Sequence, residues 1–212
     1  MIKNVIFDWS GVINDNLSTV YKTAMLVFKQ FGIKEITLEE FRREWKQPYM
    51  LFYNKYIPDI DIETEQKAYT KAYREVTKTN PPLMYPGIKK VLKRIKGAGI
   101  NMIIISSDTT ETLLEEVEIF GLKEMFDEIN SNVHDKCGII KDTLERNNFK
   151  PEETAFVGDT SHEIEAGNEA GTITIAVTWG LQNKERLEKD NPDFLVSNLD
   201  ELEKAIIFKG RF

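Results

Sequence analysis

Beyond residue 80, short apolar runs alternate with segments of helical periodicity as far as the C-terminal residues. The clearest run is Met102-Ile103-Ile104-Ile105, which is typical of a strand buried on both faces. Further strands are expected at 126–129, 154–157, 173–177 and 193–196. Helices are expected at 87–96, 111–120, 139–147, 162–170, 184–189 and 199–207. This alternation predicts an α/β fold, a Rossmann-like parallel sheet with helices on both faces.

The first strand is separated from this pattern by a long helical stretch. Residues 2–7 form a strand-like run that contains Val5-Ile6-Phe7 and stops at Asp8. From residue 16 to 79 the apolar residues recur at three- and four-residue spacing instead, beginning with Leu17, Val20 and Tyr21. Two further helices are expected in this stretch, one from a capping-box signature at Thr37 and Glu40 and one from Thr64 onward.

The proline-containing segment Asn80-Pro81-Pro82 cannot continue a helix and is expected to be a linker. The first strand therefore belongs with the later alternating pattern. We predict an α/β domain made of residues 1–15 and 80–212, interrupted by a small all-helical domain at residues 16–79.

Composition restricts the partners and the compartment. The net charge of the 212-residue chain is −7, and its lysines and arginines are spread along the sequence, so no nucleic-acid partner is expected. The single cysteine, Cys137, excludes an internal disulfide, and a reducing cytoplasm is the expected location. No apolar run is long enough to span a bilayer, so no membrane association is expected. The sequence does not indicate an oligomeric state.

Polar residues follow the expected strands at the edge where sites form in open α/β sheets. Asp8 ends the first strand, Ser106 follows the run 102–105, and Asp159 follows 154–157 with Glu163 four residues later. Lys136 precedes the strand 154–157, at the start of a helix. Together they supply carboxylates for a hard cation such as Mg²⁺, a carboxylate nucleophile, and a hydroxyl and an ammonium group for phosphoryl oxygens.

These residues also carry a family resemblance over nearly all of the α/β part. The four motifs occur in order: Val5-Ile6-Phe7-Asp8-Trp9-Ser10-Gly11-Val12, then Ile103-Ile104-Ile105-Ser106-Ser107, then Lys136, then Phe156-Val157-Gly158-Asp159 through Gly167. In this arrangement the chain resembles the haloacid dehalogenase-like hydrolase superfamily, in particular its phosphoglycolate phosphatase-like branch. The helical insertion falls where such proteins carry a cap over the active site.

The resemblance implies a Mg²⁺-dependent hydrolase that acts on a small phosphorylated metabolite. Asp8 would be the nucleophile and a metal ligand, and Ser106 would bind the phosphoryl group. Lys136 would bridge the nucleophile and the phosphate; Lys141 is the competing lysine, and Lys136 is preferred because it lies nearer the expected strand end. The remaining metal ligands would be Asp159, Glu163 and the backbone carbonyl of Ser10.

Substrate contacts are expected from Ser107 and from two cationic residues of the helical insertion, Arg43 and Lys46. Simpler interpretations remain for each of them. Ser106 and Ser107 could be helix caps, and Arg43 and Lys46 could lie on a solvated helix face.

One position departs from the family pattern. Phosphatases of this family usually carry aspartate two residues after the nucleophile, as general acid and base, and here that residue is Ser10. Such a group typically contributes about 100- to 10,000-fold to the rate, so a slow phosphatase is expected, and Ser10→Asp is expected to raise turnover at least about tenfold. Two alternatives stay open: a phosphonoacetaldehyde hydrolase-like enzyme that cleaves a carbon–phosphorus bond with Lys46 as Schiff base, and a non-catalytic phosphate-binding or regulatory protein.

Overall fold

A computed structural model describes residues 1–133 and 135–208 and contains a six-stranded sheet whose neighbouring strands are all parallel. The strand order is β3-β2-β1-β4-β5-β6. The strands are β1 (Asn4–Phe7), β2 (Asn101–Ile105), β3 (Glu128–Asn130), β4 (Thr154–Gly158), β5 (Ile173–Val177) and β6 (Phe194–Val196). The predicted α/β class is confirmed.

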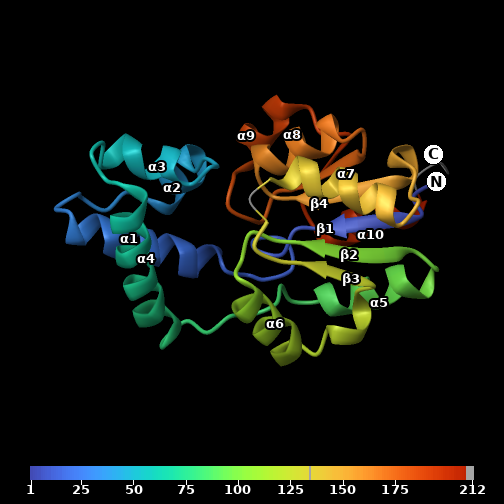
Figure 1. Ribbon diagram of the computed structural model, residues 1–212, viewed down its shortest axis with the longest axis horizontal. Helices are drawn as coiled ribbons and strands as arrows, with labels where there is room; N and C mark the ends of the chain where they lie inside the picture. The colour runs from blue at the N-terminus through green and yellow to red at the C-terminus, as the bar shows by residue number, and fades with distance from the viewer. Residues whose placement is uncertain (134, 209–212) are drawn as a thin grey trace.

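Alternate residues of the central strands supply two separate hydrophobic cores, because successive side chains of a strand point to opposite faces. On one face, Ile6, Ile103 and Phe156 pack with residues of the helices α7 (Lys136–Arg146) and α8 (Ser161–Glu169). On the other face, strand residues such as Val5 and Phe7 pack with α5, α6 and α10. These three helices are α5 (Ile88–Gly97), α6 (Thr110–Ile119) and α10 (Leu199–Phe208). The sheet is therefore a middle layer between two layers of helices (Figure 1).

Short elements complete the α/β part and shift some predicted boundaries. The helix expected at 184–189 is α9 (Lys184–Leu187) followed by a 3₁₀ turn, η3 (Glu188–Asp190), which ends at Asn191 in a left-handed conformation. The two other 3₁₀ turns are η1 (Lys123–Met125) and η2 (Pro151–Glu153). The edge strand β3 lies one to two residues later than expected.

Residues 16–79, called the helical insert below, contain four helices that lie beside the sheet (Figure 1). They are α1 (Leu17–Gln30), α2 (Leu38–Glu44), α3 (Met50–Tyr56) and α4 (Ile62–Thr77). Thr37 caps α2 as expected, whereas α4 begins before Thr64, because Asp61 is its N-cap and accepts a hydrogen bond from Thr64 N at 2.9 Å. A core of its own, rich in aromatic side chains such as Phe28 and Phe52, holds the four helices together.

The two connections between the helical insert and the α/β part run side by side. Asn14 forms an antiparallel bridge with Met84, and backbone hydrogen bonds of 2.7 Å from Asp15 N to Leu83 O and 3.2 Å from Tyr85 N to Ile13 O flank it. Both crossings lie beyond the carboxyl end of β1. Since β1 lies between β2 and β4, the chain order reverses beside it, and a crevice is expected there.

None of the helices in the described ranges is both long enough and apolar enough to cross a membrane.

Candidate active site

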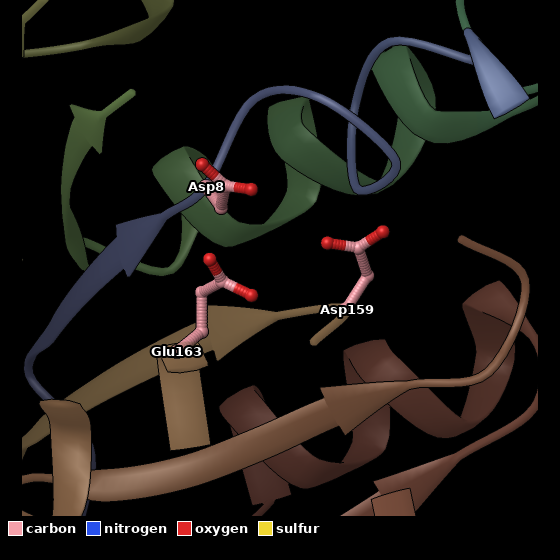
Figure 2. A group of neighbouring side chains, drawn as sticks. All are labelled: Asp8, Asp159 and Glu163. Carbon is pink, nitrogen blue, oxygen red and sulfur yellow. The ribbon is translucent and has the colours of Figure 1, made fainter. Parts of the chain in front are cut away.

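Three strand ends and two helix starts bring the expected residues together. Asp8 follows β1, Asp159 follows β4, and Glu163 lies in the first turn of α8. One carboxylate oxygen from each lies within 4.8 Å of the others, and all three side chains are buried. Figure 2 shows the three carboxylates pointing into a common space. The local reason is the topology, because β1 and β4 are neighbours and their carboxyl ends share one edge of the sheet.

Lys136, the first residue of α7, lies between two of these carboxylates. Its Nζ is 2.9 Å from Asp8 Oδ1 and 2.6 Å from Glu163 Oε1, and only 2% of its side chain is exposed. Burial disfavours the ammonium form, but Asp8 and Glu163 outweigh it and raise the pKa of Lys136 above its ordinary value. Lys141, the competing lysine, lies on the surface and pairs with Glu169 at 3.3 Å. The structure thus brings Lys136, and not Lys141, into contact with Asp8.

The three carboxylates differ in how their charge is supported. Burial raises the pKa of Asp8 to about 7, and Lys136 opposes this shift. Burial raises the pKa of Asp159 well above its ordinary value, and the neighbouring Glu163 and Asp8 add to this effect. At Glu163, burial is outweighed by Lys136 and by the Thr160 hydroxyl, so the pKa of this carboxyl lies below its ordinary value. Glu163 and Thr160 also form a capping box at the start of α8.

The carboxylate of Asp159 lies against the backbone of Gly11, Gly180 and Leu181. Its Oδ2 accepts a hydrogen bond from Leu181 N at 2.6 Å, while no described residue donates a hydrogen bond to its buried Oδ1. A Cβ added to Gly11 would lie 2.0 Å from Asp159 Oδ2, and one added to Gly180 would lie 2.1 Å from it. Glycine is therefore required at both positions. Gly11 also has a φ of +76°, in the left-handed region that favours glycine.

This donor set fits a hard divalent cation. One lysine ammonium faces three buried carboxyl groups, so the cluster would carry an excess of negative charge with all three ionised. Asp159 Oδ1 is also a buried acceptor without a described donor. Buried carboxylates need a counter-charge, and oxygen ligands are those that Mg²⁺ prefers.

Ser10 and Ser106 share a partner, Asp108, to which the sequence pattern assigned no role of its own. Asp108 Oδ2 accepts hydrogen bonds from Ser10 Oγ at 2.9 Å and from Ser106 Oγ at 3.0 Å. Ser10 Oγ also accepts a hydrogen bond from Asn16 Nδ2 at 2.9 Å. The two hydroxyls from separate motifs are therefore joined through one carboxylate. The sequence signal was present, since Asp108 lies at the same strand end as Ser106.

Glu116 of α6 forms hydrogen bonds with two residues of the loop that follows β1. Its Oε2 accepts hydrogen bonds from Trp9 Nε1 at 2.6 Å and from Asn14 Nδ2 at 2.8 Å. Burial raises the pKa of this carboxyl to about 7. Since Glu116 lies mid-helix with no motif around it, sequence reasoning had no signal for this role.

Arg42 and Gln182 join the helical insert to the α/β part. The Arg42 guanidinium donates to the carbonyls of Thr178 at 2.7 Å and Gln182 at 2.9 Å. Gln182 Nε2 donates to Trp45 O at 2.8 Å, and its Oε1 accepts from Ser161 N at 2.7 Å. The loop 178–182 therefore contacts the insert on one side and Asp159 on the other.

The three expected substrate contacts lie outside this cluster. Arg43 is exposed and pairs with Glu44 at 3.1 Å. Lys46 is exposed and takes part in no ion pair within the described part of the chain. Ser107 is exposed beside the crevice. Neighbouring helix positions point in directions about 100° apart, so Arg42, and not Arg43, faces the α/β part.

Comparison with known proteins agrees with this architecture. Residues 5–177 match the family described as haloacid dehalogenase-like hydrolase, so the chain belongs to that hydrolase family, as the resemblance implied. It is 24% identical over 207 residues to a phosphoglycolate phosphatase from Synechococcus elongatus, covering 95% of this chain and 96% of that protein. It is also 24% identical over 207 residues to the pyrophosphatase PpaX from Listeria monocytogenes, covering 95% and 94%. The crystal structure of a predicted phosphatase from Clostridium acetobutylicum matches with a TM-score of 0.79 and 24% identity, covering 98% of this chain and all of that one (100%), which supports the fold.

Proposed function

We propose that this chain is a Mg²⁺-dependent phosphatase that removes phosphate from a small phosphorylated metabolite through an aspartyl-phosphate on Asp8. The observation that carries the proposal is the placement of the Asp8 carboxylate, 2.9 Å from Lys136 Nζ and grouped with Asp159 and Glu163 at the strand ends. The names of the relatives, a phosphoglycolate phosphatase and a pyrophosphatase, support a phosphorylated small molecule as the substrate class.

In the first step, an Asp8 carboxylate oxygen attacks phosphorus and the bond between phosphorus and the leaving oxygen breaks. The bonding electrons stay with the leaving oxygen, which takes a proton, and the phosphoryl group remains on Asp8. In the second step, water attacks phosphorus, the bond to Asp8 breaks, and phosphate leaves with one proton of the water transferred to a base. Splitting one displacement into two is the advantage of a covalent intermediate.

The protein's own groups orient and neutralise the transferring phosphoryl group. Lys136 can donate to its oxygens from beside Asp8. The Ser106 hydroxyl at the end of β2 donates to Asp108 Oδ2 at 3.0 Å and would turn from it to donate to a phosphoryl oxygen. Asp8, Asp159 and the Ser10 carbonyl would hold the cation, with Glu163 in direct or water-mediated contact. The cation would supply positive charge for the phosphoryl oxygens.

The helical insert is proposed to cover the crevice and to select the substrate. Ser107, Arg43 and Lys46 stay predictions as substrate contacts. No observation favours carbon–phosphorus cleavage, since the exposed Lys46 is not part of the cluster. The single Cys137, the net charge of −7 and the absence of a clustered basic patch in the sequence support a cytoplasmic enzyme without a nucleic-acid partner.

A screen of phosphorylated metabolites with Mg²⁺ and with EDTA tests the proposal. Hydrolysis should require Mg²⁺, and mass spectrometry of the quenched enzyme should find phosphate on Asp8. Asp8→Asn should abolish turnover but retain the fold, and beryllium fluoride should raise the Tm of the wild type much more than that of the variant. Full activity after exhaustive chelation, or undiminished turnover of Asp8→Asn, contradicts the proposal.

A further inference from the structure

The environment of Asp108 differs from that of the other crevice carboxylates. Its Oδ2 is fixed by two hydroxyl donors, Ser10 Oγ at 2.9 Å and Ser106 Oγ at 3.0 Å, and its own backbone N–H donates to Ser106 Oγ at 3.1 Å. The side chain is thus oriented at the end of β2, adjacent to the residue that is proposed to bind the phosphoryl group.

The second oxygen of Asp108 is open. No residue in the ranges 1–133 and 135–208 donates a hydrogen bond to its Oδ1, and the side chain is only half-buried. The three cluster carboxylates have other partners. Glu163 contacts Lys136 and Thr160, and Asp8 contacts Lys136. Asp159 is buried in the cluster and accepts a hydrogen bond from Leu181 N. Asp108 therefore combines a fixed orientation with a second carboxylate oxygen that is free to exchange a proton.

Both steps of the proposed reaction need a group that exchanges a proton. The leaving oxygen must gain a proton in the first step, and the attacking water must lose one in the second. A serine hydroxyl is too weak an acid and too weak a base for either task at neutral pH. Two carboxylates stabilise the ammonium form of Lys136 and raise its pKa, so it does not readily give up a proton. A carboxyl group is suited to both.

We propose that Asp108 is the catalytic acid and base of this enzyme, an inference that rests on the proposed function. In the first step Asp108 gives a proton to the leaving oxygen as the bond from phosphorus breaks. The resulting carboxylate then takes a proton from water as the new bond to phosphorus forms and the bond to Asp8 breaks, which restores the starting state. Ser10, which accepts a hydrogen bond from Asn16 and donates one to Asp108 Oδ2, is a positioning residue for this carboxylate.

This assignment changes the expectation for Ser10→Asp. A carboxylate at position 10 would lie close to Asp108, because the two side chains are in hydrogen-bond contact. The added carboxylate should therefore give little gain in the wild-type background. In a chain that lacks the Asp108 carboxylate, the same substitution should restore much of the lost rate.

The test compares Asp108→Asn, the double variant Ser10→Asp/Asp108→Asn and the control Glu111→Gln with the wild type. Asn keeps an oxygen acceptor for both hydroxyls but cannot exchange the proton. With an alkyl phosphate and Mg²⁺, Asp108→Asn should lose about 100-fold or more in kcat, while an aryl phosphate should still give a burst and a phosphorylated Asp8 that persists. Glu111 is exposed in the first turn of α6, so its variant changes a nearby charge and should keep wild-type kcat.

Each result separates this inference from the proposed function. Wild-type turnover with phosphate on Asp8, together with unchanged kcat in Asp108→Asn, overturns the role of Asp108 alone. A variant that only binds inorganic phosphate more tightly, with unchanged kcat, also overturns it. An inactive wild type overturns both proposals. If Asp108→Asn does not fold, Asp108→Ser takes its place, and recovery of rate by Ser10→Asp in either background supports the inference.

Discussion

Buried polar side chains in the crevice and those inside the helical insert differ in their hydrogen-bond and ion-pair partners. In the crevice, Lys136 joins two carboxylates and Glu116 accepts two hydrogen bonds, so the side chains are oriented by the protein itself. Inside the insert, Trp45 Nε1, Tyr53 OH and Glu65 Oε1 are buried with no hydrogen-bond partner among the described residues. The crevice also holds a buried acceptor without a described donor, Asp159 Oδ1, but that atom belongs to the carboxylate cluster proposed to hold the cation. Removing a buried group that has hydrogen-bond partners leaves those partners unsatisfied and lowers the free energy of unfolding. A buried group without a partner already lowers that free energy, so its removal costs less. Substitutions should therefore have large effects in the crevice and small or opposite effects in the insert.

The largest effect is expected at Lys136. Lys136→Met leaves Asp8 and Glu163 buried without their shared cation, and breaking a buried pair in this way typically costs about 3–5 kcal/mol of unfolding free energy. Turnover should fall to background. Denaturant unfolding in EDTA and a phosphatase assay measure both. The matched control, Lys141→Met, removes an exposed lysine and should change neither; equal effects at the two positions would contradict this assignment.

A pair of glycines separates backbone strain from crowding at the site. Gly11 and Gly99 share a φ of +76°, but a Cβ at Gly11 would lie 2.0 Å from Asp159 Oδ2, whereas none of the atoms described lies within 4 Å of a Cβ at Gly99. Gly99→Ala should cost about 1–2 kcal/mol through conformation alone and keep activity. Gly11→Ala should cost about 1–3 kcal/mol more and abolish turnover. Similar losses for both would show that Asp159 can move aside.

Arg42 lies at the boundary between the helical insert and the α/β part, and its substitution is expected to weaken substrate binding. Arg42→Met removes the hydrogen bonds to the Thr178 and Gln182 carbonyls, and a loss of about 1.5 kcal/mol would raise KM roughly tenfold if these bonds favour the closed insert. Steady-state kinetics on the best substrate measure this. Arg43→Met should change KM less. A larger effect at Arg43 would instead support the predicted contact between Arg43 and the substrate.

The last comparison concerns two buried glutamates, whose effects on stability depend on pH. Burial raises the pKa of both Glu65 and Glu116 from 4.5 to about 7. Between these values the folded protein binds more protons than the unfolded chain, so stability falls as pH rises from about 4.5 to 7 and is level above that range. Glu65→Gln should remove its share, raising stability at pH 8 by up to about 3 kcal/mol and leaving it unchanged near pH 4.

Glu116→Gln should flatten the same pH range with a smaller gain. The amide oxygen keeps the hydrogen bonds from Trp9 and Asn14 but accepts them without a charge. Thermal unfolding of both variants from pH 4 to 8 provides the measurement. A decrease in stability of Glu65→Gln at pH 8 would show that the insert does support this carboxylate.

The sequence was informative where local pattern and topology coincide. Apolar runs such as 102–105 and 173–177 identified strands. Parallel strands bring their carboxyl ends to one edge of a sheet, so Asp8, Ser106 and Asp159 could be grouped from the sequence alone. Helix α3 was not delimited, because an aromatic-rich stretch after Pro48 shows no clean period. The contacts of Arg42, Gln182 and Glu116 depend on which face of an element meets another element. That information is tertiary, and no spacing in the sequence carries it.

The loop 178–182 carries a thermodynamic consequence. Leu181 packs in the core of the helical insert while its N–H is bonded to Asp159 Oδ2 at 2.6 Å, so one short segment takes part in both regions. Coupling of this kind is reciprocal. Any factor by which closure of the insert strengthens cation binding is also the factor by which the cation favours closure. Titrating the substrate-free protein with Mg²⁺ would therefore report on the position of the helices without any turnover at all.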